Sequence, residues 1–150
     1  MWHFTSDWHL DHANIIKYSK RPFLSDQEVA DGKVLPASVK AMNDALIEST
    51  NAAVREDDHL VHAGDLLFSP VDELFDRLRD HRKRIRCKNV YLIWGNHDKN
   101  IQDLYYGTGY FNHPQWRHAT EEVSKMFAGV YPSYTFNIAS QKVYVSHYPH

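Results

Sequence analysis

The sequence predicts an α/β fold in which parallel strands are joined by helical crossovers. Short apolar runs alternate along the chain with longer segments of helical periodicity, which is the arrangement typical of a parallel sheet. Each apolar run is also followed directly by polar residues. In α/β sheets, ligands bind beyond the carboxyl ends of the strands. The three runs that carry this argument cover residues 2–6, 59–63 and 90–94.

The first third of the chain contains one strand and one long helix in this prediction. Residues 2–6 form the strand, and residues 14–18 form a short helix. Residues 19–35 are expected to be irregular. Pro36 begins a helix that extends to about Val54, because apolar side chains recur on one face at helical spacing.

The rest of the chain continues the alternation of strands and helices. Residues 59–63 form the second strand, and Ser69 caps a helix with Pro70 at its first position that ends near Arg86. Residues 90–94 form the third strand. After it we expect a long aromatic connection, a short helix and two strands joined by a turn, at 99–118, 120–127, 134–138 and 143–146.

Composition restricts the class of protein. The 150 residues are 43% hydrophobic and 24% charged, which indicates one globular domain. A net charge of −2 gives no strong attraction to nucleic acid or to anionic membranes. Cys87 is the single cysteine, so an intrachain disulfide is excluded. With no apolar run of membrane-spanning length and no basic signal sequence at the N-terminus, we expect a cytoplasmic protein without a membrane partner.

The residues that follow the strands form a set suited to divalent metals. Carboxylate and amide oxygens together with imidazole nitrogens, and no cysteine, suit Mn, Fe, Zn, Ni or Mg in a catalytic site, not a structural zinc site. Glycine before Asp65 permits a sharp turn, so that this aspartate could bridge two ions. The five candidate metal ligands are Asp7, His9, Asp65, Asn96 and His147.

Each motif alone has an ordinary structural explanation. Asp-x-His and Gly-Asp are common in turns, Asn-His-Asp after glycine can cap a helix, and a histidine at the end of a strand is often simply packed. Their occurrence together, each after a strand, favours a metal site. Two metals roughly 3.5–4 Å apart activate water for attack on a phosphoryl group. His97 is then placed to protonate the leaving oxygen, and Asp98 either orients His97 or caps the next helix.

These residues resemble the first four motifs of the calcineurin-like metallophosphoesterases. The matching segments are Ser6–His9, Gly64-Asp65, Gly95–Asp98 and Ser146-His147. Further matches, including His12, Asn14-Ile15-Ile16 and Arg21-Pro22-Phe23, resemble the small single-domain branch common in bacteria and phages. The resemblance covers nearly the whole chain.

The resemblance implies a sandwich of two β-sheets flanked by helices, with a dinuclear metal centre. Asp7 and His9 would bind one metal, Asp65 would bridge, and Asn96 and His147 would bind the other. His97 would act as the acid or stabilise the transition state. The resemblance also implies that three further residues contact the substrate or support the ligands from behind: His12, Asn14 and Arg21. Manganese is the metal we expect.

One part of the family pattern is absent from these 150 residues. The family's fifth motif, Gly-His-x-His, follows the fourth and supplies one histidine to each metal. We therefore expect residues 1–150 to be a single domain of this kind, truncated after the fourth motif and lacking the C-terminal strands. There are three explanations. The sequence is a truncated part of a longer one, the protein is naturally shorter, or a partner chain supplies the rest. His3, His62 and His150 are candidate replacements, although His62 is expected to pack within its strand.

Two functions follow from this pattern. The first is a metal-dependent phosphoesterase that hydrolyses phosphate mono- or diesters with a metal-bridging hydroxide as the nucleophile. Its substrate would be a small phosphate ester or nucleotide, whereas the charge does not support extended nucleic-acid contact. The alternative is a catalytically impaired remnant that acts as a binding or assembly module. In either case a dimer or a partner chain could cover the open sheet edge.

Overall fold

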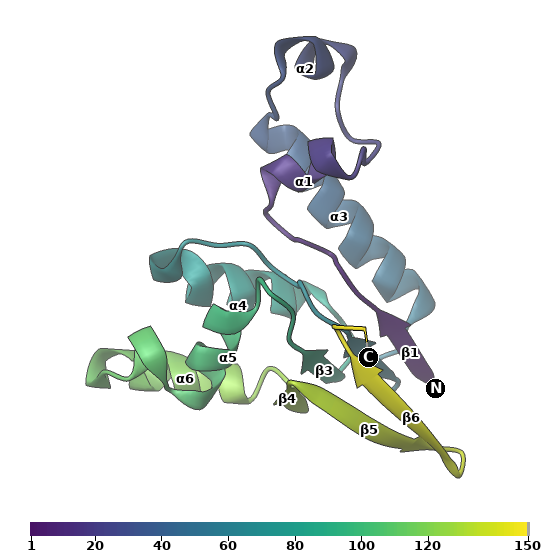
Figure 1. Ribbon diagram of the computed structural model, residues 1–150, viewed down its shortest axis with the longest axis vertical. Coiled ribbons are helices and arrows are strands. Elements are labelled where there is room, and N and C mark those ends of the chain that lie inside the picture. Colours follow the sequence, from purple (N-terminus) through teal and green to yellow (C-terminus); the bar gives the residue numbers. More distant parts are fainter. Residues whose placement is uncertain (150) are drawn as a thin grey trace.

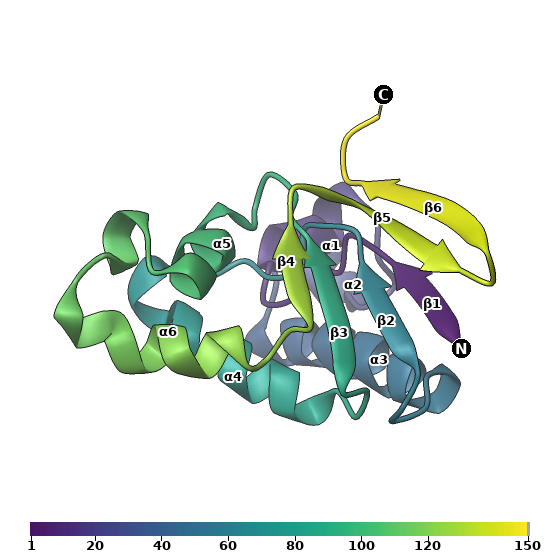
Figure 2. The same ribbon diagram turned by 90° about the horizontal axis from the view of Figure 1, so that it is seen from below.

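The computed structural model describes residues 1–149 and contains two β-sheets with helices on one side (Figures 1 and 2). The first sheet is parallel, with the strand order β1-β2-β3-β4. Its strands are β1 (Trp2–Thr5), β2 (His59–His62), β3 (Asn89–Ile93) and β4 (Gly129–Tyr131). The second sheet is an antiparallel hairpin of β5 (Ser133–Ile138) and β6 (Gln141–Ser146). The predicted α/β sandwich of two sheets flanked by helices is confirmed.

Helices connect the parallel strands. α1 (Ala13–Tyr18), α2 (Asp26–Asp31) and α3 (Pro36–Ala53) lie between β1 and β2. A 3₁₀ turn, η1 (Val71–Glu73), and α4 (Leu74–Arg84) lie between β2 and β3. The link from β3 to β4 contains α5 (Lys99–Tyr106), η2 (Gly109–Phe111), η3 (Pro114–Trp116) and α6 (Arg117–Ser124). In residues 1–149, no helix is both long and apolar enough to cross a bilayer.

The parallel sheet is covered on both faces, because successive side chains of a strand point to opposite sides. Leu60 and Leu92 belong to the large core cluster, which also includes Ile47 of α3 and Leu78 of α4. Val61 and Ile93, the next residues along each strand, pack instead with Phe136 of the hairpin in a smaller cluster. Figure 2 shows the hairpin crossing the sheet, with α3 and α4 behind it.

The strand register brings the predicted site loops together. Thr5 pairs with His62, and His62 pairs with Leu92. The loops that begin near residues 6, 63 and 94 therefore leave the sheet at one edge. The ladder continues beyond β1, because Asp7 N–H donates to the Gly64 carbonyl (2.9 Å) and Leu10 bridges to Leu67.

Four local expectations were wrong. Residues 19–35 contain α2, and residues 99–118 contain α5 and two 3₁₀ turns. Ser69 does not cap a helix; its hydroxyl donates to the Pro70 carbonyl, and a 3₁₀ turn begins two residues later. The short strand β4 was not expected at all. The helices at 36–53 and 117–124 and the hairpin strands agree with the sequence to within a few residues.

Candidate metal centre

The loop after β1 holds Asp7 and His9 in an unusual backbone conformation. Both residues have positive φ, at 55° and 50°, and Asp65 in the neighbouring loop has a φ of 55°. Residues with side chains rarely adopt this conformation, and such strain is concentrated at functional sites. Hydrogen bonds maintain it, because His9 N–H donates to the Asp65 carbonyl (2.9 Å). The two loops are thus fixed to each other.

Two glycines let these loops approach the side chains of the site. A Cβ on Gly95 would lie 2.4 Å from Asp65 Oδ1 and 2.8 Å from His147 Nε2. A Cβ on Gly64 would lie 2.3 Å from His147 Nδ1. A side chain at either position would displace the side chain of Asp65 or His147, so glycine at both positions preserves the geometry of the site.

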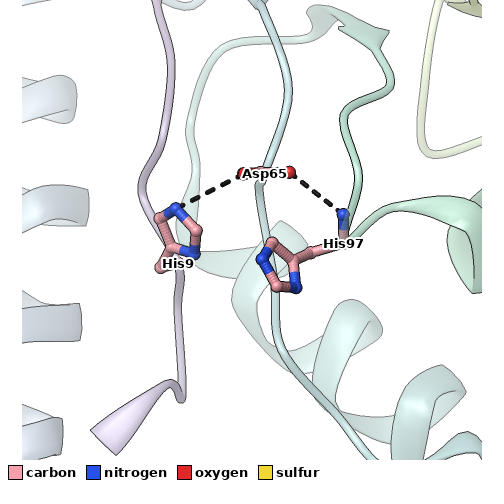
Figure 3. A group of neighbouring side chains, drawn as sticks. All are labelled: His9, Asp65 and His97. Carbon is pink, nitrogen blue, oxygen red and sulfur yellow. Dashed lines mark hydrogen bonds and ion pairs between the residues drawn. The ribbon is translucent and has the colours of Figure 1, made fainter. Parts of the chain in front are cut away.

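The Asp65 carboxylate lies at the centre of the candidate ligands. Asp65 Oδ2 is 3.6 Å from His9 Nε2 and 3.6 Å from His147 Nε2. Its other oxygen, Oδ1, accepts the backbone N–H of His97 (3.0 Å). Figure 3 shows Asp65 between His9 and His97, with a dashed line to each. Asp65 is buried, so few water molecules can compete with a metal for its carboxylate oxygens.

Two groups of side chains could each hold a metal, and they share Asp65. The first is His9, Asp65 and His97; the second is Asp7, Asp65 and His147. Within each group the donor atoms lie within 4.8 Å of one another. The mixed set of carboxylate oxygens and imidazole nitrogens fits a divalent transition metal. His97, which the sequence suggested as an acid, is therefore also within reach of a metal.

The ring of His147 is oriented by the sheet. Its Nδ1 lies 2.8 Å from the Ala63 carbonyl, and this contact assigns the proton to Nδ1. Nε2 is then the nitrogen with a free lone pair, and it is the one that faces Asp65.

Burial changes the protonation of the site. Desolvation lowers the pKa of His9, although the charge of Asp65 opposes this shift. Desolvation likewise lowers the pKa of His12. Both rings are therefore neutral near pH 7, which is the form in which imidazole binds a metal.

Asp98 connects the two ligand loops. It is fully buried, and its carboxylate accepts the backbone N–H groups of Asp65 (2.6 Å), Gly95 (2.7 Å) and Leu66 (2.9 Å). It does not cap α5 with its side chain, so the expectation of a helix cap was wrong. Its partners are backbone groups, not the His97 ring.

The three supporting residues are placed differently from one another. Arg21 donates to the carbonyls of Asp7 (2.6 Å) and Trp8 (2.7 Å), so it supports the first loop from behind. His12 lies beside His9, with their Nδ1 atoms 3.5 Å apart. Asn14 is exposed on α1, and its side chain makes no hydrogen bond to residues 1–149. The structure thus joins Arg21 and His12 to the site, but not Asn14.

The other candidate histidines lie elsewhere. His3 contacts Asp58 (3.0 Å) at the opposite end of the sheet from the ligands. His62 is buried among apolar residues, where desolvation lowers its pKa to about 3. His150 lies outside the described residues.

Sequence analysis did not single out two aromatic residues at the site. The Tyr148 hydroxyl donates to Asn96 Oδ1, the oxygen predicted to bind a metal. Phe68 stacks on His12. Both residues could have been found in the sequence, because each lies close to a predicted ligand. Tyr148 directly follows His147, and Phe68 lies three residues after Asp65.

The family model for calcineurin-like phosphoesterases matches residues 3–149. The chain belongs to this family. The match includes every loop of the metal centre described above. The domain is therefore of the phosphoesterase type, and the carboxylates and imidazoles of its two candidate groups suit a divalent metal.

Two individual proteins are similar to this chain. The uncharacterised protein MJ1445 of Methanocaldococcus jannaschii is 35% identical over 96 residues, which cover 63% of this chain and 44% of that protein. The crystal structure of AQ665 from Aquifex aeolicus, a protein of unknown function, matches with a TM-score of 0.59 and 20% identity. That match covers 99% of this chain and 61% of the other, so both relatives are substantially longer than the part this chain matches. The structural likeness supports the fold alone.

Proposed function

We propose that this chain is a dinuclear metal-dependent phosphohydrolase that cleaves phosphate mono- or diesters. The observation that carries the proposal is the position of Asp65, whose Oδ2 is equally distant from His9 Nε2 and His147 Nε2 at 3.6 Å. A carboxylate between two imidazole-containing groups is the arrangement needed to bridge two ions. Asp7, His9, Asp65, Asn96 and His147 are the proposed ligands, and Mn²⁺ is the proposed metal.

Different residues of the chain have different roles in the proposed reaction. When bound, the divalent ions lower the pKa of a water molecule and neutralise the charge on the phosphoryl oxygens. His97 donates a proton to the leaving oxygen. Asp98 holds the Asp65 and Gly95 loops in register through its three N–H contacts, and Arg21 fixes the loop of Asp7 and His9. His12, Arg21 and Asn14 also support placement in the small single-domain branch of the family.

The test uses metal-stripped protein resupplied with Mn²⁺ and bis(p-nitrophenyl) phosphate as substrate. We expect turnover that depends on the metal and is lost in Asp65→Asn, with two Mn²⁺ bound per wild-type chain. Asp72→Asn is the matched control, because Asp72 is an aspartate outside the site that accepts a hydrogen bond from Tyr110. Folded protein that binds one metal or fewer without turnover would contradict the proposal. It would favour instead the catalytically impaired binding module.

A further inference from the structure

An exposed phenylalanine lies beside the candidate metal ligands. Phe68 is 45% exposed, and its ring contacts the rings of His12 and His97. Its backbone is not free to move aside, because its N–H donates to the Leu10 carbonyl (2.9 Å) and the preceding residue bridges to Leu10. The same ladder fixes His9 and Asp65. The ring is therefore presented at a fixed distance from the ligands.

The ring of Phe68 is supported by two histidines. It stacks on His12 with a centroid separation of 4.4 Å and an interplanar angle of 16°. It also meets the His97 ring at 6.1 Å and 67°, in an edge contact. His12 and His97 are themselves 5.9 Å apart. The three rings form an aromatic wall in which Phe68 and His97 are exposed and His12 is partly buried.

We propose that Phe68, backed by His12, is a stacking surface for a flat aromatic ring of the substrate. This inference rests on the proposed phosphohydrolase function and names its substrate class: a nucleotide, or another phosphate ester that carries an aromatic group. Every nucleobase has a π-face, so a single phenylalanine can hold any of them by stacking. His97, the proposed proton donor to the leaving oxygen, touches Phe68. The aromatic ring therefore belongs to the leaving group.

The test compares two ligands that differ only in the base. Binding of adenosine 5′-monophosphate and of ribose 5-phosphate to Mn²⁺-loaded protein is measured by isothermal titration calorimetry. We expect the nucleotide to bind roughly tenfold more tightly. Phe68→Leu should remove this difference and leave the affinity for ribose 5-phosphate within twofold, while Phe68→Trp should retain it. Phe4→Leu is the matched control, because Phe4 is 48% exposed on β1 and should leave both affinities unchanged.

Equal affinity for the two ligands, or an equal loss of both in Phe68→Leu, would overturn the stacking surface. A failure of the stacking proposal can be distinguished from a failure of the proposed phosphohydrolase function. If the nucleotide binds through Phe68 but bis(p-nitrophenyl) phosphate is not hydrolysed, the stacking surface stands and the hydrolase proposal fails. If the diester is hydrolysed but the base adds no affinity, the stacking surface alone is wrong.

Discussion

A single buried carboxylate explains how the ligand loops keep their shape. Asp98 was predicted at the site from its place after Asn96 and His97, but its partners could not be read from the sequence. Two of its three partners are backbone N–H groups of a loop more than thirty residues away, at Asp65 and Leu66. Backbone donors have no sequence signature. The ligand residue types were predictable, whereas the contacts that hold them in place depend on the fold.

Asp98→Asn should destabilise the protein and weaken metal binding. The carboxamide replaces one acceptor oxygen with an NH₂ group, which then faces an N–H donor in a buried position. Leaving such a group unsatisfied costs about 1–3 kcal/mol. The free energy of unfolding in urea and the Mn²⁺ affinity should both fall, whereas Asp72→Asn should change neither. An unchanged unfolding curve for Asp98→Asn would contradict this account.

Gly95→Ala should prevent metal binding and leave the protein folded. Its Cβ would lie 2.4 Å from Asp65 Oδ1, so the Asp65 carboxylate must move. Gly107→Ala is the contrasting variant, because a Cβ there would meet only Thr120 at 3.4 Å and the cost is backbone strain at a φ of 67°. Metal content of the two proteins, measured by elemental analysis beside their circular dichroism, distinguishes the effects. Two bound metals in Gly95→Ala would be the contrary result.

At the scale of elements, the long helix and the strands were predictable and three shorter elements were not. α2 was missed, although Ser25 and Glu28 form a capping box whose spacing is visible in the sequence. α5 is not predicted, because aromatic residues followed by Gly107 are also typical of a loop. β4 is only three residues long and depends on its pairing with β3. Tertiary contact, not local preference, decides an element of that length.

The α2 segment should contribute pH-dependent stability through Glu28. The backbone N–H of Leu35 and that of Ser25, with the Ser38 hydroxyl, lower the pKa of Glu28 from 4.5 to about 2. Because the folded pKa is depressed, this contribution is present above pH 4.5 and is lost as the pH falls towards about 2.

The corresponding measurement is Tm against pH for wild type and Glu28→Gln. The wild type should be the more stable protein at pH 5, and its advantage should shrink as the pH falls towards about 2. Glu48→Gln, at an exposed position of α3, should follow the wild-type curve. A difference between wild type and Glu28→Gln that is constant with pH would show that the carboxylate charge is not responsible.

At the scale of the whole molecule, the strand pattern indicated a parallel sheet, and only the family resemblance indicated that a second sheet and helices cover it. Val61 and Ile93 lie in continuous apolar runs, which show that both faces of a strand are buried without identifying the partner. The structure places the hairpin on one face, through Phe136, and α3 and α4 on the other. The position of His147, at the end of that hairpin, follows from this packing.

Phe136→Ala should therefore couple stability to metal affinity. Phe136 is buried between the hairpin and the parallel sheet, and its removal should cost about 3–5 kcal/mol. Leu104→Ala, in the helical core of α5, should cost about 2–5 kcal/mol. Only Phe136→Ala should also weaken Mn²⁺ binding, because the hairpin carries His147. Urea unfolding and calorimetric titration at a temperature where both variants are folded measure the two effects, and equal Mn²⁺ affinities would contradict the coupling.

The place of His147 in the chain has a consequence for how the protein is made. His9 and His147 both face Asp65, yet they lie 138 positions apart in the chain. A ribosome adding about 5–20 residues per second needs roughly 7–30 seconds to cover that distance. Asp65 is made part-way through that interval, and from then on Asp7, His9 and Asp65 exist on the growing chain without His147. The group of Asp7, Asp65 and His147 is therefore incomplete until β6 and the residue after it have been made.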